Sequence, residues 1–331
     1  MSSEVPAVFY VSNRYFLFPT LSSIFQLLKT TTRARYKVYL FLVDVSSVEV
    51  EEISKHLSRY GVRVLVLPPE RLSFDGSIDF SRSRIPSVAL GRFCVGDMIP
   101  ECHSKLIYLD GDVLALSDIS SLIEIPIQEG FIYGVSEHLW LTKSIFGSYW
   151  KRHRLYLSYL GIDSPKDYFN AGVFVVNRKT WIDRGAQCLE YFGRHNNRYL
   201  YVDQSALNHV FLGKRKSLSP LYNYTSEYAM LVRPDRVSAR IVHFTGGIKP
   251  WECDFGPWGK EFFNLYQRIA RENPWISKYL SGLTDDTKLT LARAYRHRVF
   301  RSRLVFWRRV FRRYRFRGYL GQFRGRLYID S

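Results

Sequence analysis

Short apolar runs alternate with amphipathic stretches through the first third of the chain. The apolar, β-prone runs span 7–11, 37–43 and 62–67, and apolar residues recur at helical spacing over 19–29 and 48–60. Short apolar runs bounded by polar or proline residues are typical of strands, and a period near 3.6 residues is typical of helices. Strands that alternate with helices predict an α/β protein with a parallel, Rossmann-like sheet.

The same pattern continues to about residue 262. A helix is predicted over 85–98, and strands are predicted over 105–109, 131–135, 172–177 and 240–244. Beyond this point the chain becomes rich in arginine and aromatic residues, and no further strand is predicted. We therefore expect one domain over residues 1–261 and a helical C-terminal region over residues 262–331.

The composition excludes a disordered chain, and most of the net positive charge lies at the C-terminal end of the sequence. Of the 331 residues, 46% are hydrophobic and 24% are charged, which is typical of a globular protein. The net charge is +18, but residues 291–331 hold thirteen arginines and a single acid, Asp330. This tail therefore carries +12, and the basic character belongs to the tail and not to the preceding domain.

The tail also carries an apolar stripe. Phe300, Leu304, Trp307, Phe311 and Tyr314 recur at helical spacing, with arginines between them. Arginine combined with interfacial aromatic residues fits a helix that lies on an anionic membrane surface. Two alternatives are a helix packed on the domain with a solvated basic face, and a nucleic-acid-binding tail. No recognised nucleic-acid motif accompanies the tail, so a nucleic-acid partner is not expected.

Nothing in the sequence indicates export or a membrane-spanning segment. The four cysteines, Cys94, Cys102, Cys188 and Cys253, form no CxxC pair and are expected to be reduced, mostly buried thiols. The N-terminus carries Glu4 and no basic region, and the apolar stretch after Tyr15 is interrupted by polar residues. We expect a cytoplasmic protein, peripheral on the cytosolic face of the membrane through its tail.

Two carboxylates follow the apolar strand predicted over 105–109. Asp110 and Asp112 flank Gly111, and ligands bind at this end of strands in open parallel sheets. Carboxylates at this spacing can hold a divalent cation that also binds phosphate oxygens. One alternative is an ordinary acidic turn. Another is a phosphohydrolase, but that class places its aspartates after the first strand and before a Gly-Thr pair.

A second polar segment, from His243 to Trp251, begins at the end of the strand predicted over 240–244. Here His243 can ligate a metal, Gly246 allows close approach of backbone to phosphate, and Lys249 offers a positive charge. The alternative is a strand-end turn with a buried histidine and a surface lysine.

Two further segments offer groups suited to a sugar. Asn170 and Gly172 lie at the start of a β-branched run, where an amide can bind hydroxyl groups. Asp203 and Gln204 precede a predicted helix, although Asp203 is equally suited to capping that helix.

Taken in order, these segments resemble the retaining glycosyltransferases of family 8, which include glycogenin and bacterial lipopolysaccharide galactosyl- and glucosyltransferases. The resemblance covers nearly the whole chain. It runs through Tyr15, Arg92, LDGDV at 109–113, FNAGVFVVN at 169–177, VDQSALN at 202–208, LYNY at 221–224, HFTGGIKPW at 243–251 and ENPW at 272–275.

The resemblance implies a GT-A fold, which is a single Rossmann-like mixed sheet flanked by helices, and a UDP-sugar donor. It implies that Asp110, Asp112 and His243 hold Mn²⁺ or Mg²⁺, and that Gln204 and Asp203 act at the reacting centre. Gln204 is expected to stabilise an oxocarbenium-like state during front-side displacement with retention. The remaining donor-binding residues that it implies are Val11, Tyr15, Arg92, Gly111, Asn170, Ala171, Gly172, Gly246 and Lys249.

The chain departs from the family pattern at two places. Ser12 and Asn13 replace an acidic pair before Tyr15, and Glu137 and His138 stand where the family often has an aspartate. The first change affects uracil recognition, and the second affects the sugar and the acceptor. The expected acceptor is a glycan or glycolipid, with a lipopolysaccharide core as the leading candidate. A member that only binds is disfavoured, because the implied metal and diphosphate residues are intact.

Overall fold

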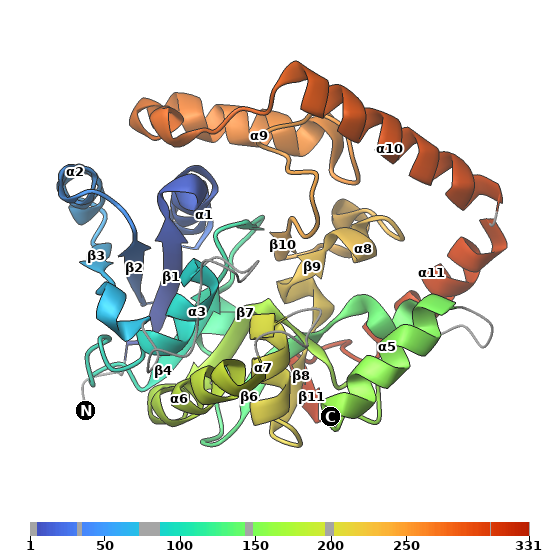
Figure 1. Cartoon of the computed structure of the whole chain (residues 1–331), viewed down its shortest axis with the longest axis horizontal. Helices are drawn as coiled ribbons and strands as arrows, with labels where there is room; N and C mark the ends of the chain where they lie inside the picture. The colour runs from blue at the N-terminus through green and yellow to red at the C-terminus, as the bar shows by residue number, and fades with distance from the viewer. Residues whose placement is uncertain are drawn as a thin grey trace.

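A mixed eight-stranded sheet forms the centre of the protein (Figure 1). The computed structural model describes residues 5–31, 35–72, 87–142, 148–195, 202–304 and 306–330. Across the sheet the strands are β11 (Tyr328–Asp330), β8 (Arg215–Leu218), β6 (Ile132–Ser136), β7 (Phe169–Asn177), β4 (Lys105–Leu109), β1 (Ala7–Asn13), β2 (Lys37–Val43) and β3 (Arg63–Val66).

The strand directions agree with the sequence only in part. Strand β1 is parallel to β2 and β4, and β2 is parallel to β3, as the alternation of strands and helices predicts. Strand β7 is antiparallel to both β4 and β6, so the prediction of an all-parallel sheet was wrong. The mixed sheet implied by the family resemblance is confirmed. Alternation cannot reveal this reversal, because the long connection from β4 to β7 can return the chain in either direction.

A second, three-stranded sheet lies beside the first and was not predicted. It contains β5 (Val113–Ala115), β10 (Ile241–His243) and β9 (Tyr224–Thr225). Of these three, only β10 lies within a predicted strand. Strand β5 pairs antiparallel with β10 so that Val113 lies opposite His243. This pairing brings residues far apart in sequence to one place.

Helices cover both faces of the central sheet. Side chains on β1 alternate between two cores: Val8 and Tyr10 enter one, and Phe9 and Val11 enter the other. The first core lies under α1 (Leu17–Thr30), α2 (Ser47–Ser58), α9 (Gly259–Glu272) and the second sheet. The other lies under α3 (Ser87–Cys94), α6 (Arg178–His195) and α7 (Val202–Val210). Residues 85, 86 and 201, which belong to predicted segments, lie outside the described residues.

The remaining helices are short, except for α5 and the helices of the C-terminal region. They are η1 (Arg14–Phe16), η2 (Pro69–Arg71), α4 (Ser120–Ile123), η3 (His138–Thr142), α5 (Ser148–Tyr159), η4 (Pro220–Tyr222), α8 (Ser226–Ala229), η5 (Pro234–Val237), η6 (Pro274–Tyr279), α10 (Asp285–Leu304) and α11 (Phe306–Gly321). None of the helices described is both long and apolar enough to span a bilayer.

The end of the chain returns to the central sheet. Strand β11 pairs antiparallel with β8, so the prediction of no strand beyond residue 262 was wrong. This strand is too short to produce a local pattern, and it forms because the edge of β8 is available. The boundary at residue 261 stays a prediction, although residues beyond it share the core of the preceding domain.

Helix α11 packs on the domain, but not through the apolar stripe seen in the sequence. Phe316 and Tyr319 are buried, and the Phe316 ring stacks on Tyr228 at 4.5 Å. Trp307, Phe311 and Tyr314 are 58%, 59% and 76% exposed. Since each residue turns the helix by about 100°, these three lie opposite the buried pair. The stripe therefore faces away from the domain. The side chain of Leu304 lies outside the described residues.

We expect the two faces of α11 to respond differently to truncation. Phe316→Ala removes a fully buried ring and should lower the free energy of unfolding by about 3–5 kcal/mol. Phe311→Ala changes an exposed ring and should lower it by less than about 1 kcal/mol. Urea unfolding followed by circular dichroism measures both changes. Equal losses would contradict this orientation of the helix.

Candidate active site at the end of strand β4

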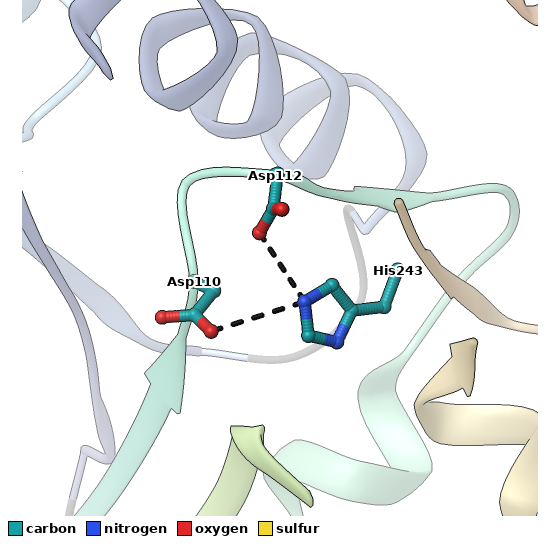
Figure 2. Close-up of side chains that lie close together, drawn as sticks. All are labelled: Asp110, Asp112 and His243. Atoms are coloured by element: carbon teal, nitrogen blue, oxygen red, sulfur yellow. Dashed lines mark ion pairs between the residues drawn. The ribbon is translucent and has the colours of Figure 1, made fainter. Parts of the chain in front are cut away.

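Asp110 and Asp112 lie at the carboxyl end of β4, facing a histidine from the second sheet (Figure 2). Backbone N–H of Asp110 donates to the Gly172 carbonyl at 2.8 Å, which ties this turn to β7. Glycine is required at position 111, because a Cβ there would lie 2.1 Å from the hydroxyl oxygen of Thr20 on α1. The turn between the carboxylates therefore packs directly against α1.

His243 completes a compact set of three metal-ligating side chains. Its Nε2 lies 3.2 Å from Oδ1 of Asp112 and 3.9 Å from Oδ2 of Asp110. One ligand atom from each residue lies within 4.8 Å of the others. Gly172 leaves room for the ring, because a Cβ there would come within 2.2 Å of Cε1 of His243. The structure thus brings together the three predicted metal ligands.

The orientation of His243 fits a divalent cation. Its Nδ1–H donates to Oδ1 of Asn223 at 2.9 Å, so Nε2 is the ring nitrogen that faces the carboxylates and would bind a metal after losing its proton. Two carboxylates and a neutral imidazole suit manganese, and magnesium less well because it prefers oxygen ligands. The role of Asn223 was not predicted, although it lies in the LYNY segment that carried the resemblance.

Lys249 places a positive charge beside Asp112. Its Nζ donates to Oδ2 of Asp112 and to the Phe244 carbonyl, both at 2.7 Å. Burial alone would raise the pKa of Asp112, but Lys249 and His243 outweigh burial and hold that pKa below its usual range. For Asp110, burial prevails and raises the pKa. The two carboxyl groups therefore differ in how readily they ionise.

A buried arginine links the carboxylates to α7. One guanidinium nitrogen of Arg92 lies 3.4 Å from Oδ1 of Asp110 and 3.2 Å from Oδ2 of Asp203. Another donates to the Ala171 carbonyl at 3.0 Å, and the guanidinium lies over the Tyr108 ring. The Tyr108 hydroxyl donates to Asp110 at 2.5 Å. The side chain of Asp203 therefore points into the site.

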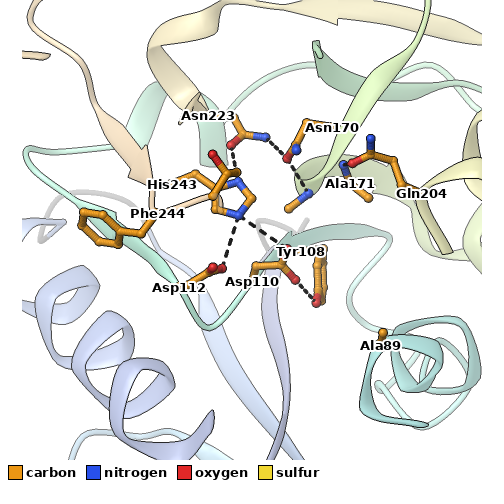
Figure 3. A network of polar contacts seen from close by, with 12 residues as sticks. Ala89, Tyr108, Asp110, Asp112, Asn170, Ala171, Gln204, Asn223, His243 and Phe244 are labelled. Atoms are coloured by element: carbon orange, nitrogen blue, oxygen red, sulfur yellow. Dashed lines mark hydrogen bonds and ion pairs between the residues drawn. The ribbon is translucent and has the colours of Figure 1, made fainter. Parts of the chain in front are cut away.

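A chain of side-chain amides continues from the histidine to the start of β7 (Figure 3). Nδ2 of Asn223 donates to Oδ1 of Asn170 at 2.8 Å, and Nδ2 of Asn170 donates to Oε2 of Glu137 at 2.8 Å. Gln204 donates to the same Glu137 oxygen at 3.3 Å and accepts from the Ala171 N–H at 3.1 Å. Glu137, seen in the sequence only as a departure, thus orients both amides.

Comparison with known proteins identifies the family. Residues 7–254 match the sequence profile of glycosyl transferase family 8. The chain belongs to this family.

Its relatives and structural neighbours are distant. General stress protein A of Bacillus subtilis is 23% identical over 265 residues, which cover 74% of this chain and 87% of that protein. Lipopolysaccharide 1,2-glucosyltransferase of Escherichia coli K12 is 29% identical over 186 residues, covering 52% of this chain and 50% of that enzyme.

The solved structure of the galactosyltransferase LgtC, in complex with donor and acceptor sugar analogues, superposes with a TM-score of 0.63 at 19% identity. The match covers 79% of this chain and 95% of LgtC. The central mixed sheet flanked by helices is therefore the GT-A fold, and this prediction is confirmed. Membership of a family of glycosyltransferases also agrees with the predicted reaction class.

Three of the residues expected from the family lie outside this network. Val11 is buried in the core beside α3, where its Cγ1 faces Gly91. Tyr15 is 77% exposed. Gly246 has a φ of +85°, a left-handed conformation that favours glycine, and a Cβ there would meet no atom within 4 Å. These three residues therefore take no part in the hydrogen-bond network of the site, and their contacts to the donor stay predictions.

Glu137 should also make the protein sensitive to acid. Burial alone would raise the pKa of Glu137, but His138 and Asn170 outweigh it and lower the pKa to about 2. The ionised group therefore contributes about 3 kcal/mol of stability above its unfolded pKa of about 4.3, and this is lost as pH falls toward 2. We expect Glu137→Gln to flatten the fall in unfolding free energy between about pH 5 and pH 2. Urea titrations across this range measure it, and an unchanged slope would contradict it.

Proposed function

We propose that this family 8 member is a retaining glycosyltransferase that moves a hexose, galactose or glucose, from a UDP-sugar to a glycan acceptor. The observation that carries the proposal is the meeting of Asp110, Asp112 and His243 at the carboxyl end of β4. These three residues would hold Mn²⁺ or Mg²⁺.

The diphosphate of the donor would lie beside this cluster. The metal, when bound, neutralises negative charge on the departing UDP. Lys249 already lies within 2.7 Å of Asp112 and would add a positive charge to the same phosphates. Gly111 and Gly246 would let backbone approach the diphosphate, and Tyr15 would stack near the uracil.

The sugar would bind between Arg92, Asp203 and the amides at the start of β7. Arg92 and Asp203 form an ion pair at 3.2 Å whose charged atoms can bind hydroxyl groups. Asn170, Ala171 and Gly172 would line the same pocket. Gln204 is held from both ends of its amide, by Ala171 and Glu137, so its orientation is fixed before the donor binds. An amide oxygen is a poor nucleophile, which favours Gln204 as a stabiliser of an oxocarbenium-like state during front-side displacement.

A lipopolysaccharide or lipooligosaccharide core is the acceptor we favour. One relative is named as a lipopolysaccharide glucosyltransferase, and the superposed LgtC is named as a galactosyltransferase. The basic, aromatic face of α11 would bring the enzyme to the anionic cytosolic leaflet, where such a glycolipid is extended. The alternative function, nucleic-acid binding through the tail, gains no support from the family match.

Release of UDP from a panel of UDP-sugars in the presence of Mn²⁺ tests the proposal. We expect slow hydrolysis of one UDP-hexose by the wild type, and its loss on chelation or in the His243→Ala variant. Retention is then tested by the anomeric configuration of the product formed on a soluble acceptor. If neither turnover nor manganese-dependent UDP binding is found, the transferase proposal is wrong.

A further inference from the structure

Helix α5 carries a second exposed face that combines basic and apolar side chains. Leu155 is 56% exposed and Tyr159 is 70% exposed. The exposed basic residues of the same helix are Lys151, Arg152 and Arg154. Its other face is buried against the domain through Trp150, His153, Tyr156 and Leu157.

The side chains on the exposed face are arranged in a regular way. At about 100° per residue, Leu155 and Lys151 lie near the middle of the exposed arc, and Tyr159 and Arg152 lie toward one edge of it. Arg154 lies at the other edge. The two large apolar side chains are thus neighbours between Lys151 and Arg152.

This face differs from an ordinary solvated helix. Helix α5 contains no acidic residue, and within the described residues no ion pair is found for Lys151, Arg152 or Arg154. On α2, by contrast, Glu49, Glu51 and Glu52 accompany the basic residues, which is typical of a helix face in water. The excess positive charge on α5 therefore has no counterpart on the helix itself.

Helices α5 and α11 lie at the same end of the molecule (Figure 1). Helix α11 packs against η3, the short helix that precedes α5. Arg315 on α11 donates to the Trp140 carbonyl at 3.0 Å, and the rings of Trp140 and Tyr319 lie 4.7 Å apart. Figure 1 shows α5 and α11 at the same end of the molecule, opposite α2 and β3. The helix η3 that α11 contacts begins at His138, next to Glu137.

We propose that α5 is a second membrane-docking element, and that α5 and α11 together bind the surface of an anionic bilayer. Basic residues attract anionic headgroups, and exposed Leu and Tyr enter the headgroup boundary, which is the combination both helices present. This inference rests on the proposed membrane-bound acceptor. Contacts of both helices with the bilayer fix the orientation of the protein on the membrane, whereas contact through one helix would let the protein rotate. They turn the edge of the site at Glu137 and His138 toward the leaflet that holds the acceptor.

The test uses the full chain and vesicles of equal parts phosphatidylcholine and phosphatidylglycerol. The variant Lys151→Gln/Arg152→Gln/Arg154→Gln should bind these vesicles about 100-fold more weakly, because each basic residue at an anionic surface contributes roughly fivefold. The matched control Lys55→Gln/Arg59→Gln/Arg63→Gln removes the same charge from the opposite end of the molecule and should bind as the wild type does. Equal weakening of both variants would overturn the proposal, because net charge alone would then explain binding.

A fluorescent label reports insertion at α5 directly. Cys102 is the exposed cysteine, so Cys102→Ser leaves the buried thiols and a single reactive position can be added. An environment-sensitive dye on Tyr159→Cys should shift to the blue on anionic vesicles, and the same dye on Arg59→Cys should not. Absence of a shift at position 159 while the protein is bound would assign docking to α11 alone and overturn the role of α5. Binding of duplex RNA is measured on the triple variant of α5 as well. If that variant loses RNA binding and keeps vesicle binding, the role of α5 in membrane docking is overturned.

The proposed function is tested separately in the same samples. UDP release without vesicles should be equal in the wild type and the α5 variant, since none of the three residues touches the candidate site. If UDP release fails in both while vesicle binding still depends on α5, the reaction is wrong and the docking surface stands. If UDP release is normal and vesicle binding ignores α5, the docking surface is wrong and the reaction stands.

Discussion

Replacing Asp112 with asparagine is expected to slow UDP release by about 1,000-fold, the upper part of the range for loss of one electrostatic group at a reacting phosphate or carbonyl. The substitution keeps the size of the side chain but removes its charge. Asp112 lies 3.2 Å from Nε2 of His243 and 2.7 Å from Nζ of Lys249, so both groups lose their partner at once. Steady-state UDP release, and Mn²⁺ affinity measured by electron paramagnetic resonance, report the two consequences.

The control for this prediction is an exposed aspartate. Asp235→Asn removes a carboxylate on the exposed 3₁₀ helix η5, where it pairs with Arg233, and should leave UDP release and Mn²⁺ affinity unchanged. An Asp112→Asn enzyme with wild-type Mn²⁺ affinity would mean that this carboxylate does not ligate the metal. A wild-type rate of UDP release would remove it from the reaction altogether.

The strands that a local pattern predicts well are buried ones at the centre of the main sheet. β2 and β4 were predicted to the residue, because each is a continuous apolar run between polar residues. The reversed direction of β7, the second sheet and β11 were not predicted. All three depend on pairing with residues far along the chain, as when Val113 meets His243 or Tyr328 meets Leu218. A short strand has almost no local signature to reveal such a partner.

The residues of the candidate site divide in the same way, into those that a local pattern predicts and those that depend on distant parts of the chain. Asp110 and Asp112 directly follow an apolar strand, and the ends of strands are where ligands gather in this type of fold, so this pair was predictable from the local pattern. That His243 joins them was implied by the family resemblance, because its position depends on the unpredicted second sheet. Asn223 and Glu137 act through buried hydrogen bonds to other side chains. Nothing in their sequence neighbourhood specifies those partners, because the partners come from other segments of the chain.

In the C-terminal tail, the spacing of apolar residues predicts a helix but not the direction in which its apolar face points. The spacing of Trp307, Phe311 and Tyr314 correctly indicates one helical face, but an apolar face is equally suited to a protein core and to a membrane. Phe316 and Tyr319 on the opposite side attach α11 to the domain, so the face with Trp307, Phe311 and Tyr314 is not part of the core. Binding of a membrane by this exposed face stays a proposal.

The glycine at position 172 is as important to the candidate site as any charged residue. In Gly172→Ala the added Cβ would lie 2.2 Å from Cε1 of His243 and 2.8 Å from Oδ2 of Asp110, so the ring and the carboxylate must separate. We expect UDP release to fall by about 100-fold, since a displacement of this size costs that much in a positioned site. We also expect weaker Mn²⁺ binding, and a loss of stability of about 1–3 kcal/mol from overpacking.

A neighbouring glycine provides the matched control for this steric argument. Gly247 has an ordinary φ, and a Cβ there would meet no atom within 4 Å, so Gly247→Ala should leave UDP release and Mn²⁺ affinity near the wild-type values. The two variants add the same methyl group to segments that border one site. If Gly172→Ala kept wild-type Mn²⁺ affinity while Gly247→Ala lost it, His243 would not be the ligand, and the metal would have to be held by the loop after β10.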